Sequence, residues 1–120
     1  EILSEFDQRI REKKLQVRIY FENQDFCVLA DKVLMKQAIS NVIHNALRYS
    51  NEGELVEIVL KKDKLSVKNY GVAIAAEDLE KIFEPFYCVD KSRSKKLGGS
   101  GLGLAITREI IEEHGFSIIA

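Results

Sequence analysis

The sequence predicts an α+β fold of two layers, in which a mixed sheet is covered on one face by helices, within one domain of residues 1–120. Hydrophobic side chains alternate over residues 15–22, which is typical of a half-buried strand, and two runs within 55–71 predict a hairpin of strands. They recur at helical intervals over 32–49 and 101–115, which predicts two amphipathic helices. Strands and helices mixed in this way along a short chain favour a sheet with helices packed against it.

The first elements are a helix, one or two strands and a long helix. Residues 1–14 place their hydrophobic side chains at helical spacing, and 15–22 alternate, so a helix followed by a strand is expected. The segment 27–30, CVLA, is a candidate for a second, short strand. Asp31 is expected to be the N-cap of a long helix over about 32–49.

A turn, a hairpin and a broken helix follow. NEGE, 51–54, predicts a turn, and the two runs within 55–71 predict an antiparallel hairpin. Residues 75–87 predict a short helix, which the single proline of the chain interrupts. Residues 89–100 are polar, basic and glycine-rich, which predicts a mobile loop.

The chain is expected to end with a helix and the start of a strand. The helix over 101–115 is expected to stop at Gly115, because glycine readily adopts the left-handed conformation of a helix end. FSIIA, 116–120, begins an apolar strand for which the sequence offers no partner. We therefore expect that the domain is truncated at its C-terminus and that further strands of the sheet are missing.

Composition excludes several function classes. The formal net charge of −1 gives no global field that favours nucleic acid or a membrane surface. The sequence has no signal peptide and no apolar run long enough to cross a bilayer. Cys27 and Cys88 lack metal-ligand spacing and are interpreted as free thiols, and His44 and His114 are too isolated for a zinc-type site.

A stripe of polar side chains runs along the long helix, opposite its apolar face: Gln37, Asn41, Asn45 and Arg48. Asparagine is a mediocre helix former, so two of them one turn apart are not explained by helix propensity. The stripe is either a solvated face or a site. As a site, neutral amides supply oxygen ligands for a hard cation without the charge repulsion that carboxylates would bring near a triphosphate.

Glycines precede the last helix, in KKLGGSGLGLAI. A helix start exposes backbone N–H groups with a partial positive charge, and glycines let the backbone approach a phosphate closely. Lys95 and Lys96 stand just ahead of these glycines. The spacing is wrong for a dinucleotide fingerprint, and the P-loop motif GxxxxGK[ST] is absent.

Four segments in this order, NVIHNALRYS, KNYGVAI, FEPFY and GGSGLGL, resemble the N, G1, F and G2 boxes of sensor histidine kinases. These are catalytic ATP-binding domains of the GHKL superfamily, with the Bergerat fold, a two-layer α/β sandwich. FYCVDKSRS and GGSGLGLAI most resemble membrane sensor kinases of Gram-positive bacteria, including vancomycin-resistance sensors. The resemblance implies transfer of the γ-phosphoryl group of Mg²⁺-ATP to a histidine in a separate dimerisation domain of the same kinase.

The resemblance also implies the setting of the domain. A response regulator acts downstream, and the parent kinase is a homodimer. The domain itself is cytoplasmic, and the parent is held in the cell membrane by parts outside this chain. Alone, the domain is expected to bind nucleotide and to transfer little phosphate.

In the N box, the resemblance assigns Asn45 to Mg²⁺, Arg48 to the phosphates and Tyr49 to the nucleotide. Asn41 stands at the first asparagine of the box. Gyrase-like ATPases carry a water-activating glutamate one turn before the metal asparagine. Because Asn41 is a poor base, hydrolysis is expected to be slow.

The G1 box departs from the family pattern DxGxGI, since it reads Asn69, Tyr70, Gly71, Val72, Ala73 and Ile74. The family aspartate accepts a hydrogen bond from the adenine amino group. Asn69 keeps an acceptor oxygen but has no charge, and a neutral hydrogen bond contributes about 1 kcal/mol against about 1.5–3 for a charged one. We expect weaker ATP binding and poorer discrimination against GTP.

The remaining nucleotide contacts implied by the resemblance lie in the F box, the lid and the G2 box. They are Phe83, Tyr87, Arg93, Lys95, Lys96, Gly99, Ser100, Gly101, Leu102, Gly103 and Leu104.

Three other functions stay open at this point. A nucleotide-sensing or docking module without kinase activity is favoured by Asn69 and Ala73. An ATPase of the gyrase, chaperone or mismatch-repair kind is disfavoured by Asn41. A nucleic-acid module based on KSRSKK is the weakest, because the basic run is short and the chain is net acidic.

Overall fold

The structure is a computed structural model, and it describes residues 2–22, 29–61, 64–71, 73–87 and 103–120. These residues form two compact units. The first comprises the described parts of 1–29 and 43–72, and the second those of 30–42 and 73–120. The boundary between them falls within helix α2 (Lys32–Arg48). No helix in the described part of the chain has the length and apolar character needed to cross a membrane.

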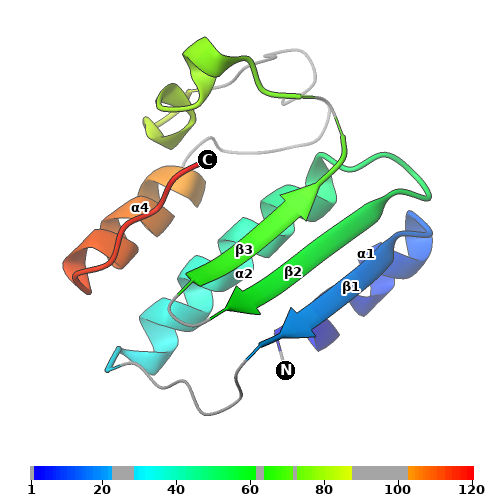
Figure 1. The fold of residues 1–120 in the computed structure, drawn as a ribbon, viewed down its shortest axis with the longest axis horizontal. Helices are drawn as coiled ribbons and strands as arrows, with labels where there is room; N and C mark the ends of the chain where they lie inside the picture. Colours follow the sequence, from blue (N-terminus) through cyan, green and yellow to red (C-terminus); the bar gives the residue numbers. More distant parts are fainter. Residues whose placement is uncertain (1, 23–28, 62–63, 72, 88–102) are drawn as a thin grey trace. The chain divides into compact units, whose positions relative to one another are not determined.

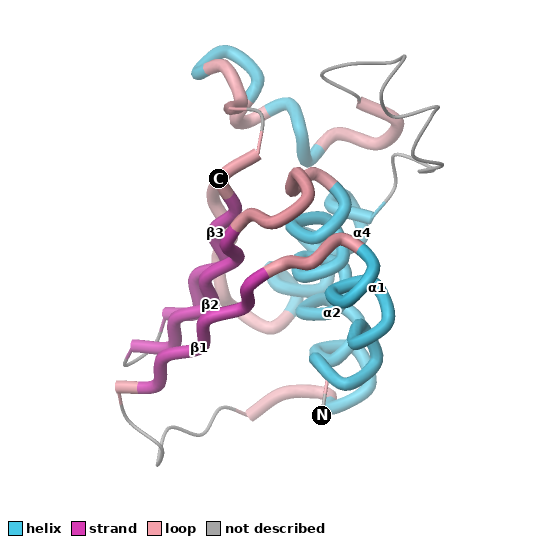
Figure 2. Tube along the Cα trace, turned by 90° about the vertical axis from the view of Figure 1, so that its right-hand side faces the viewer, coloured by secondary structure: helices cyan, strands magenta, loops and turns pink. Residues whose placement is uncertain are grey.

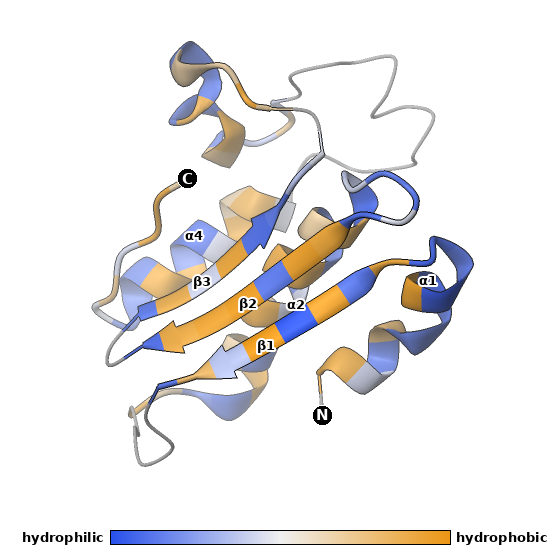
Figure 3. Ribbon diagram, turned by 45° about the vertical axis from the view of Figure 1, so that its right-hand side comes forward, coloured by the Kyte–Doolittle hydropathy of each residue, from blue (hydrophilic) through white to orange (hydrophobic). Residues whose placement is uncertain are grey.

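The first unit is built on a sheet of three strands in the order β1-β2-β3 (Figure 1). β1 (Gln16–Phe21) runs parallel to β2 (Leu55–Lys61), and β2 pairs antiparallel with β3 (Lys64–Asn69). The predicted first strand and the predicted hairpin are both confirmed, and the sheet is mixed as expected. Hydrophobic and hydrophilic residues alternate along β1, which is the pattern that predicted this strand (Figure 3).

Helices cover one face of this sheet. Val56 and Ile58, two positions apart on β2, are buried, whereas the residues between and beside them are only half-buried. Within this unit the strands form one layer, and α1 (Asp7–Glu12) and residues 43–48 of α2 lie on one side of it (Figure 2). The core of the unit comprises Leu15, Ile43, Ala46, Leu47, Val56 and Ile58. The predicted two-layer α+β class is therefore confirmed.

The N-terminal helix is shorter than predicted. A 3₁₀ turn, η1 (Leu3–Phe6), precedes α1 (Asp7–Glu12), and the chain leaves the helix through Lys14 at φ 54°. The amide of Leu15 donates to the carbonyl of Ile10 at 2.9 Å across this exit. The left-handed residue lets the chain reverse directly into β1, as at many helix ends.

α2 (Lys32–Arg48) begins and ends close to the predicted positions. The Asp31 carboxylate accepts a hydrogen bond from the Leu34 amide at 3.0 Å, so Asp31 is the N-cap that the sequence predicted. The turn at 51–54 is also confirmed. No strand includes Leu29 or Ala30, so the second short strand is wrong for these two residues; the rest of that candidate lies outside the described residues.

In the second unit, the predicted helix over 75–87 is wrong. Two 3₁₀ turns replace it, η2 (Ala76–Asp78) and η3 (Lys81–Phe83). Proline disfavours the helical conformation in the residue before it, and Glu84 accordingly adopts φ −74° and ψ 141°. A helix ended that early by Pro85 has too few residues to gain cooperative α-helical hydrogen bonding.

α4 (Gly103–Glu113) follows, and Gly115 at φ 81° ends it as predicted. His114 accepts a hydrogen bond from the Asp31 amide at its Nε2 (3.0 Å), while its Nδ1 lies 2.8 Å from the Ile110 carbonyl. The ring is therefore assigned as the neutral tautomer with the proton on Nδ1. Residues 116–120 form no strand, which corrects the prediction: an extended segment is a strand only when a neighbour completes its ladder. The predicted mobile loop, 89–100, lies outside the described residues.

Candidate functional site

The predicted amide stripe is only partly buried along α2. Asn41, Asn45 and Arg48 are half-buried, whereas Gln37 is exposed. Side chains four positions apart in one helix lie on the same face, so Asn41 and Asn45 share a face of α2. Gln37 has the exposure of an ordinary solvated residue, and none of the described residues gives it a contact that indicates a role in a site.

The N and G1 segments meet in the first unit. A Cβ atom added at Gly71 would overlap the carbonyl oxygen of Tyr49 and lie 3.0 Å from its carbonyl carbon. The same atom would lie 3.3 Å from Nδ2 of Asn69. The backbone at Gly71 therefore packs directly on the residue that follows α2, with the Asn69 amide beside it. Three predicted nucleotide contacts from two motifs are thus brought together.

Asn69 is the last residue of β3 and is half-buried. In the register of the sheet it lies opposite Val56, which is fully buried. The amide is therefore held at the end of a strand, which is a rigid position. Ala73 and Ile74 belong to the second unit, where both are exposed, and their predicted roles stay predictions.

The N and G2 segments meet in the second unit. Nδ2 of Asn41 donates a hydrogen bond of 3.4 Å to the carbonyl of Gly103, the first residue of α4. The hydroxyl of Thr107, a fully buried residue, donates to the same carbonyl at 2.8 Å. Leu104 is half-buried next to this contact. The start of α4 is thus fixed against the first asparagine of the stripe.

The rest of the predicted G2 and lid positions lie outside the described residues. They are Arg93, Lys95, Lys96, Gly99, Ser100, Gly101 and Leu102. Their roles stay predictions.

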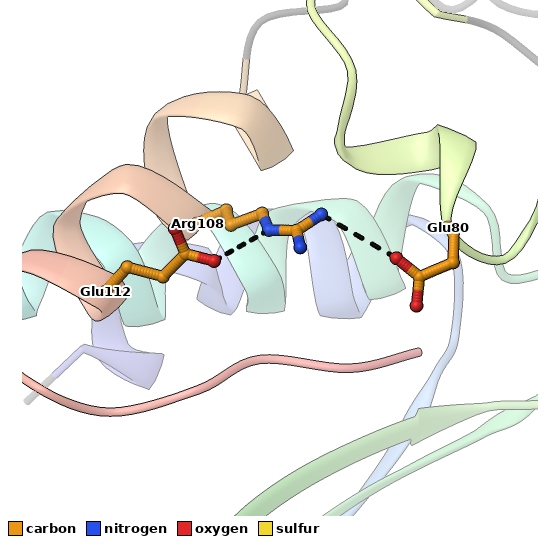
Figure 4. A network of polar contacts seen from close by, with 3 residues as sticks. All are labelled: Glu80, Arg108 and Glu112. Carbon is orange, nitrogen blue, oxygen red and sulfur yellow. Dashed lines mark hydrogen bonds and ion pairs between the residues drawn. The ribbon is translucent and has the colours of Figure 1, made fainter.

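The F segment packs on α4 through a residue that the sequence analysis did not single out. The guanidinium of Arg108 lies 5.4 Å from the ring centroid of Phe83, which is buried. Arg108 also pairs with Glu112 at 2.9 Å and with Glu80 at 3.8 Å, as Figure 4 shows. The sequence does show an arginine five residues after the start of this helix. Arginines are too common on helix surfaces for that position alone to predict the contact with Phe83.

Tyr87, the other F-box residue assigned to the nucleotide, is engaged within the protein. Its hydroxyl donates to the carboxylate of Asp78. This hydrogen bond is the main cause that raises the pKa of Tyr87 to about 12, together with burial and the neighbouring carboxylates. Phe83 and Tyr87 thus have structural partners of their own, and their contact with nucleotide stays a prediction.

His44 differs from the sequence expectation of a helix-surface residue. Its ring stacks on Phe6 with centroids 6.1 Å apart and planes at 15°, and its Nε2 is buried without a hydrogen-bond partner among the described residues. Burial lowers the pKa of His44, with smaller contributions from the cations of Arg9 and Arg48. The N-terminal 3₁₀ turn, which periodicity did not predict, supplies the ring that covers it.

The amide side chains of the stripe are oxygen donors of a kind that a hard cation accepts. In the part of the chain that the structure describes, no three His, Cys, Asp or Glu side chains gather as metal ligands. Amide oxygens are available instead at Asn41 and Asn45. Mg²⁺ accepts such oxygen ligands and takes several of the others from phosphates and water.

Comparisons with known protein sequences identify relatives of the chain. A family model described as histidine kinase-, DNA gyrase B- and HSP90-like ATPase matches residues 30–120. The chain is 42% identical over 104 residues to the sensor histidine kinase WalK of Bacillus subtilis (strain 168), covering 82% of this chain and 17% of WalK. It therefore spans about a sixth of the length of that relative.

Solved structures give the same result. A nucleotide-free catalytic domain of the histidine kinase ThkA superposes with a TM-score of 0.80 and 30% identity, over 94% of this chain and 73% of that one. ThkA in complex with the response regulator protein TrrA superposes with a TM-score of 0.79 and 29% identity, over 98% of this chain and 33% of that one.

Proposed function

Because the chain belongs to the family of histidine kinase-, DNA gyrase B- and HSP90-like ATPases, we propose that it is the ATP-binding catalytic domain of a two-component sensor histidine kinase. Its reaction is transfer of the γ-phosphoryl group of Mg²⁺-ATP to a histidine on a dimerisation domain. Similarity to sensor kinases supports this branch of the family over the others.

The contact between Asn41 and Gly103 is the single observation that carries the proposal. Asn41 belongs to the polar stripe of α2, and Gly103 begins α4; the two lie within hydrogen-bond distance in one unit. The free backbone N–H groups at a helix start bind an anion, and polar groups of another element that lie close to that start add to such a site. If these two segments had been remote from each other, the motif resemblance would have had no physical counterpart.

Four side chains of the first unit are assigned to the nucleotide: Asn45, Arg48, Tyr49 and Asn69. The amide oxygen of Asn45 suits Mg²⁺, which when bound neutralises phosphate charge. The guanidinium of Arg48 is a permanent cation suited to phosphate. The ring of Tyr49 offers a flat surface for the base, and the amide of Asn69 an acceptor for its amino group.

Asn41 favours a kinase over a gyrase-like ATPase. A neutral amide does not take a proton from water near neutral pH, so the chain lacks a general base at this position. In addition, Nδ2 of Asn41 donates to the Gly103 carbonyl, which makes Asn41 a positioning residue for the start of α4. Steady hydrolysis of Mg²⁺-ATP by the isolated chain, abolished in Asn41→Ala, would contradict this interpretation.

Titration calorimetry with Mg²⁺-ADP and with a non-hydrolysable ATP analogue tests nucleotide binding. We expect saturable heat for the unaltered chain and an affinity lower by on the order of tenfold in Asn45→Ala, from loss of one metal ligand. Gln37→Ala is the matched control, because Gln37 is an exposed residue of the same helix. No heat at millimolar nucleotide would instead favour a docking module without nucleotide.

Base selectivity is tested by competition between ATP and GTP. Asn69→Asp restores the charged acceptor and is expected to raise affinity for ATP and discrimination against GTP. Asn69→Ala is expected to weaken ATP binding. Unchanged preference in both variants would remove Asn69 from the site.

The partners follow from the reaction. The solved complex of ThkA with TrrA supports a response regulator as the partner downstream of this domain. The phosphoacceptor histidine would come from a dimerisation domain of the same kinase. Incubation of the chain with Mg²⁺-ATP labelled in the γ-phosphate and the cognate histidine domain should label that domain; labelling of neither protein would leave a nucleotide-sensing module as the better assignment.

A further inference from the structure

Lys13 has an unusual set of partners. Its ammonium nitrogen lies 2.9 Å from the carbonyl oxygen of Leu47, 2.9 Å from that of Arg48 and 3.1 Å from that of Ser50. An ammonium group has three N–H donors, and these three carbonyls match them in number. Lys13 directly follows α1, whereas all three acceptors lie at the end of α2 or just after it, within the same unit.

Lys13 completes the end of α2. The last four carbonyls of a helix have no partner within it. The carbonyl of Asn45 accepts from the Tyr49 amide at 3.1 Å, and that of Ala46 from the Ser50 hydroxyl at 2.6 Å. The other two, at Leu47 and Arg48, accept from Lys13. The positive charge also opposes the negative end of the helix dipole.

Water has little access to replace Lys13 there. Leu47 is 1% exposed and Ser50 is 2% exposed, and the lysine side chain itself is part-buried. Carbonyl oxygens buried without a donor are unfavourable, so loss of the ammonium would favour a rearranged helix end. The backbone carbonyl of Lys13 accepts from the Gly53 amide at 2.9 Å, which ties the turn after α2 to the same residue.

The residues so fixed are those assigned to the nucleotide. Arg48 carries one of the capped carbonyls, and Tyr49 lies between two residues whose carbonyls Lys13 binds. The Tyr49 carbonyl in turn packs on the backbone of Gly71, with no room for one more carbon atom. A shift of the helix end would therefore reach both the N and the G1 segments.

We propose that Lys13 is a positioning residue of the nucleotide site: its ammonium cap on the end of α2 sets the places of Arg48, Tyr49 and Gly71. The inference rests on the proposed function, because it takes these residues as nucleotide contacts. Lys13 touches no nucleotide in this proposal. It acts only through the three carbonyls and the turn that follows them.

Calorimetry of Lys13→Met and Lys14→Met with Mg²⁺-ADP tests this role. Lys14 is the matched control, because its side chain is 76% exposed and pairs at the surface with Glu52 at 3.6 Å. Lys13→Met is expected to weaken binding by on the order of tenfold, and Lys14→Met by less than about twofold. Lys13→Arg keeps charge and donors and should restore part of the affinity.

A purely structural role predicts a different result. In that case Lys13→Met lowers the thermal midpoint but binds Mg²⁺-ADP as the unaltered chain does at a temperature where both are folded, and the proposal is overturned. Amide resonances of Tyr49 and Gly71 provide a second readout, since Lys13→Met should shift both and Lys14→Met neither.

Should Lys13→Met fail to fold, the unaltered chain still decides the question. The side-chain ammonium resonance of Lys13 should be visible through slow proton exchange and should shift when Mg²⁺-ADP binds. A resonance that stays unchanged at saturation overturns the proposal. If the unaltered chain binds no Mg²⁺-ADP at all, the proposed function itself is contradicted. Calorimetry of the unaltered chain distinguishes that outcome from a failure of the Lys13 proposal alone.

Discussion

Gly71 and Gly103, one from each unit, are both glycines of the nucleotide motifs, but their surroundings differ. An added Cβ atom at Gly71 would overlap the Tyr49 carbonyl oxygen. At Gly103, no heavy atom that the structure describes lies within 4 Å of the equivalent position, outside the atoms of its own helix and its chain neighbours. Close packing against the Tyr49 backbone requires a glycine at position 71. The packing of the described residues does not require one at position 103.

This difference separates two meanings of a glycine in a motif. Gly71 allows two backbone segments to touch, so its replacement is expected to damage the fold whatever the ligand. At Gly103 the described residues leave space beside the start of a helix, which is where an anion would approach. A motif glycine that packing does not explain is the better indicator of a ligand, and the following substitutions test that distinction.

Gly71→Ala is expected to have the largest effect. The added methyl group must displace backbone rather than the flexible end of a side chain, and overpacking of that kind costs about 3 kcal/mol of unfolding free energy. Urea denaturation followed by circular dichroism measures the loss. Gly53→Ala is the control: Gly53 has φ 81° but no described atom within 4 Å, so only backbone strain of about 1 kcal/mol is expected. Equal losses in both variants would contradict the close approach.

Thr107→Val is expected to have the next largest effect. It keeps the shape of a fully buried side chain but removes the hydroxyl that donates to the Gly103 carbonyl at 2.8 Å. We expect a loss of about 1–2 kcal/mol in unfolding free energy. Thr107→Ser keeps the hydroxyl and loses only the methyl group, so it is expected to be more stable than Thr107→Val. If Thr107→Ser were the less stable of the two, the hydrogen bond would not be what fixes the start of α4.

Gly103→Ala is expected to change stability little and binding more. Alanine is a better helix former than glycine, so unfolding free energy should rise by about 0.5 kcal/mol or stay constant. Affinity for Mg²⁺-ADP should fall on the order of tenfold, because the methyl group enters the space that the proposed function gives to phosphate. Calorimetry and urea denaturation of the same preparation measure both quantities. Unchanged affinity would show that the open space beside Gly103 is not used by nucleotide.

The sequence predicted the elements whose signal is local. The alternation over β1, the hairpin of β2 and β3, the Asp31 cap and the Gly115 stop each depend on a few neighbouring residues, and all are confirmed. The 3₁₀ turns around residues 76–83 were predicted as a helix, because periodicity does not distinguish a 3₁₀ turn from a short α-helix.

Contacts between distant segments were harder to predict. The motif resemblance anticipated that Asn41 and the G2 glycines belong together, and the Asn41–Gly103 contact agrees with it. The three carbonyls bound by Lys13 were not anticipated, because they lie 34 to 37 positions away and a lysine after a helix has many possible partners. A single sequence carries no signal that selects among those partners.

The smallest expected effect is the dependence of stability on pH through His44. This residue lies near the end of α2, where its ring stacks on Phe6. Burial and the cations of Arg9 and Arg48 lower the pKa of His44 from its ordinary value of 6.5. The folded state therefore resists protonation more than the unfolded state does. Stability from this group is complete above about pH 6.5 and falls as pH decreases through 6.5 toward the lowered pKa.

Urea midpoints of the unaltered chain and of His44→Gln between pH 5 and pH 8 measure this effect, with the pH values chosen to bracket the ordinary histidine pKa. The unaltered chain should lose more stability on acidification than His44→Gln does. Phe6→Leu removes the ring that stacks on His44 and should reduce the difference, since solvent then reaches the imidazole. Parallel curves for the unaltered chain and His44→Gln would mean that the imidazole is solvated in the folded state, and that the end of α2 is more open than the structure shows.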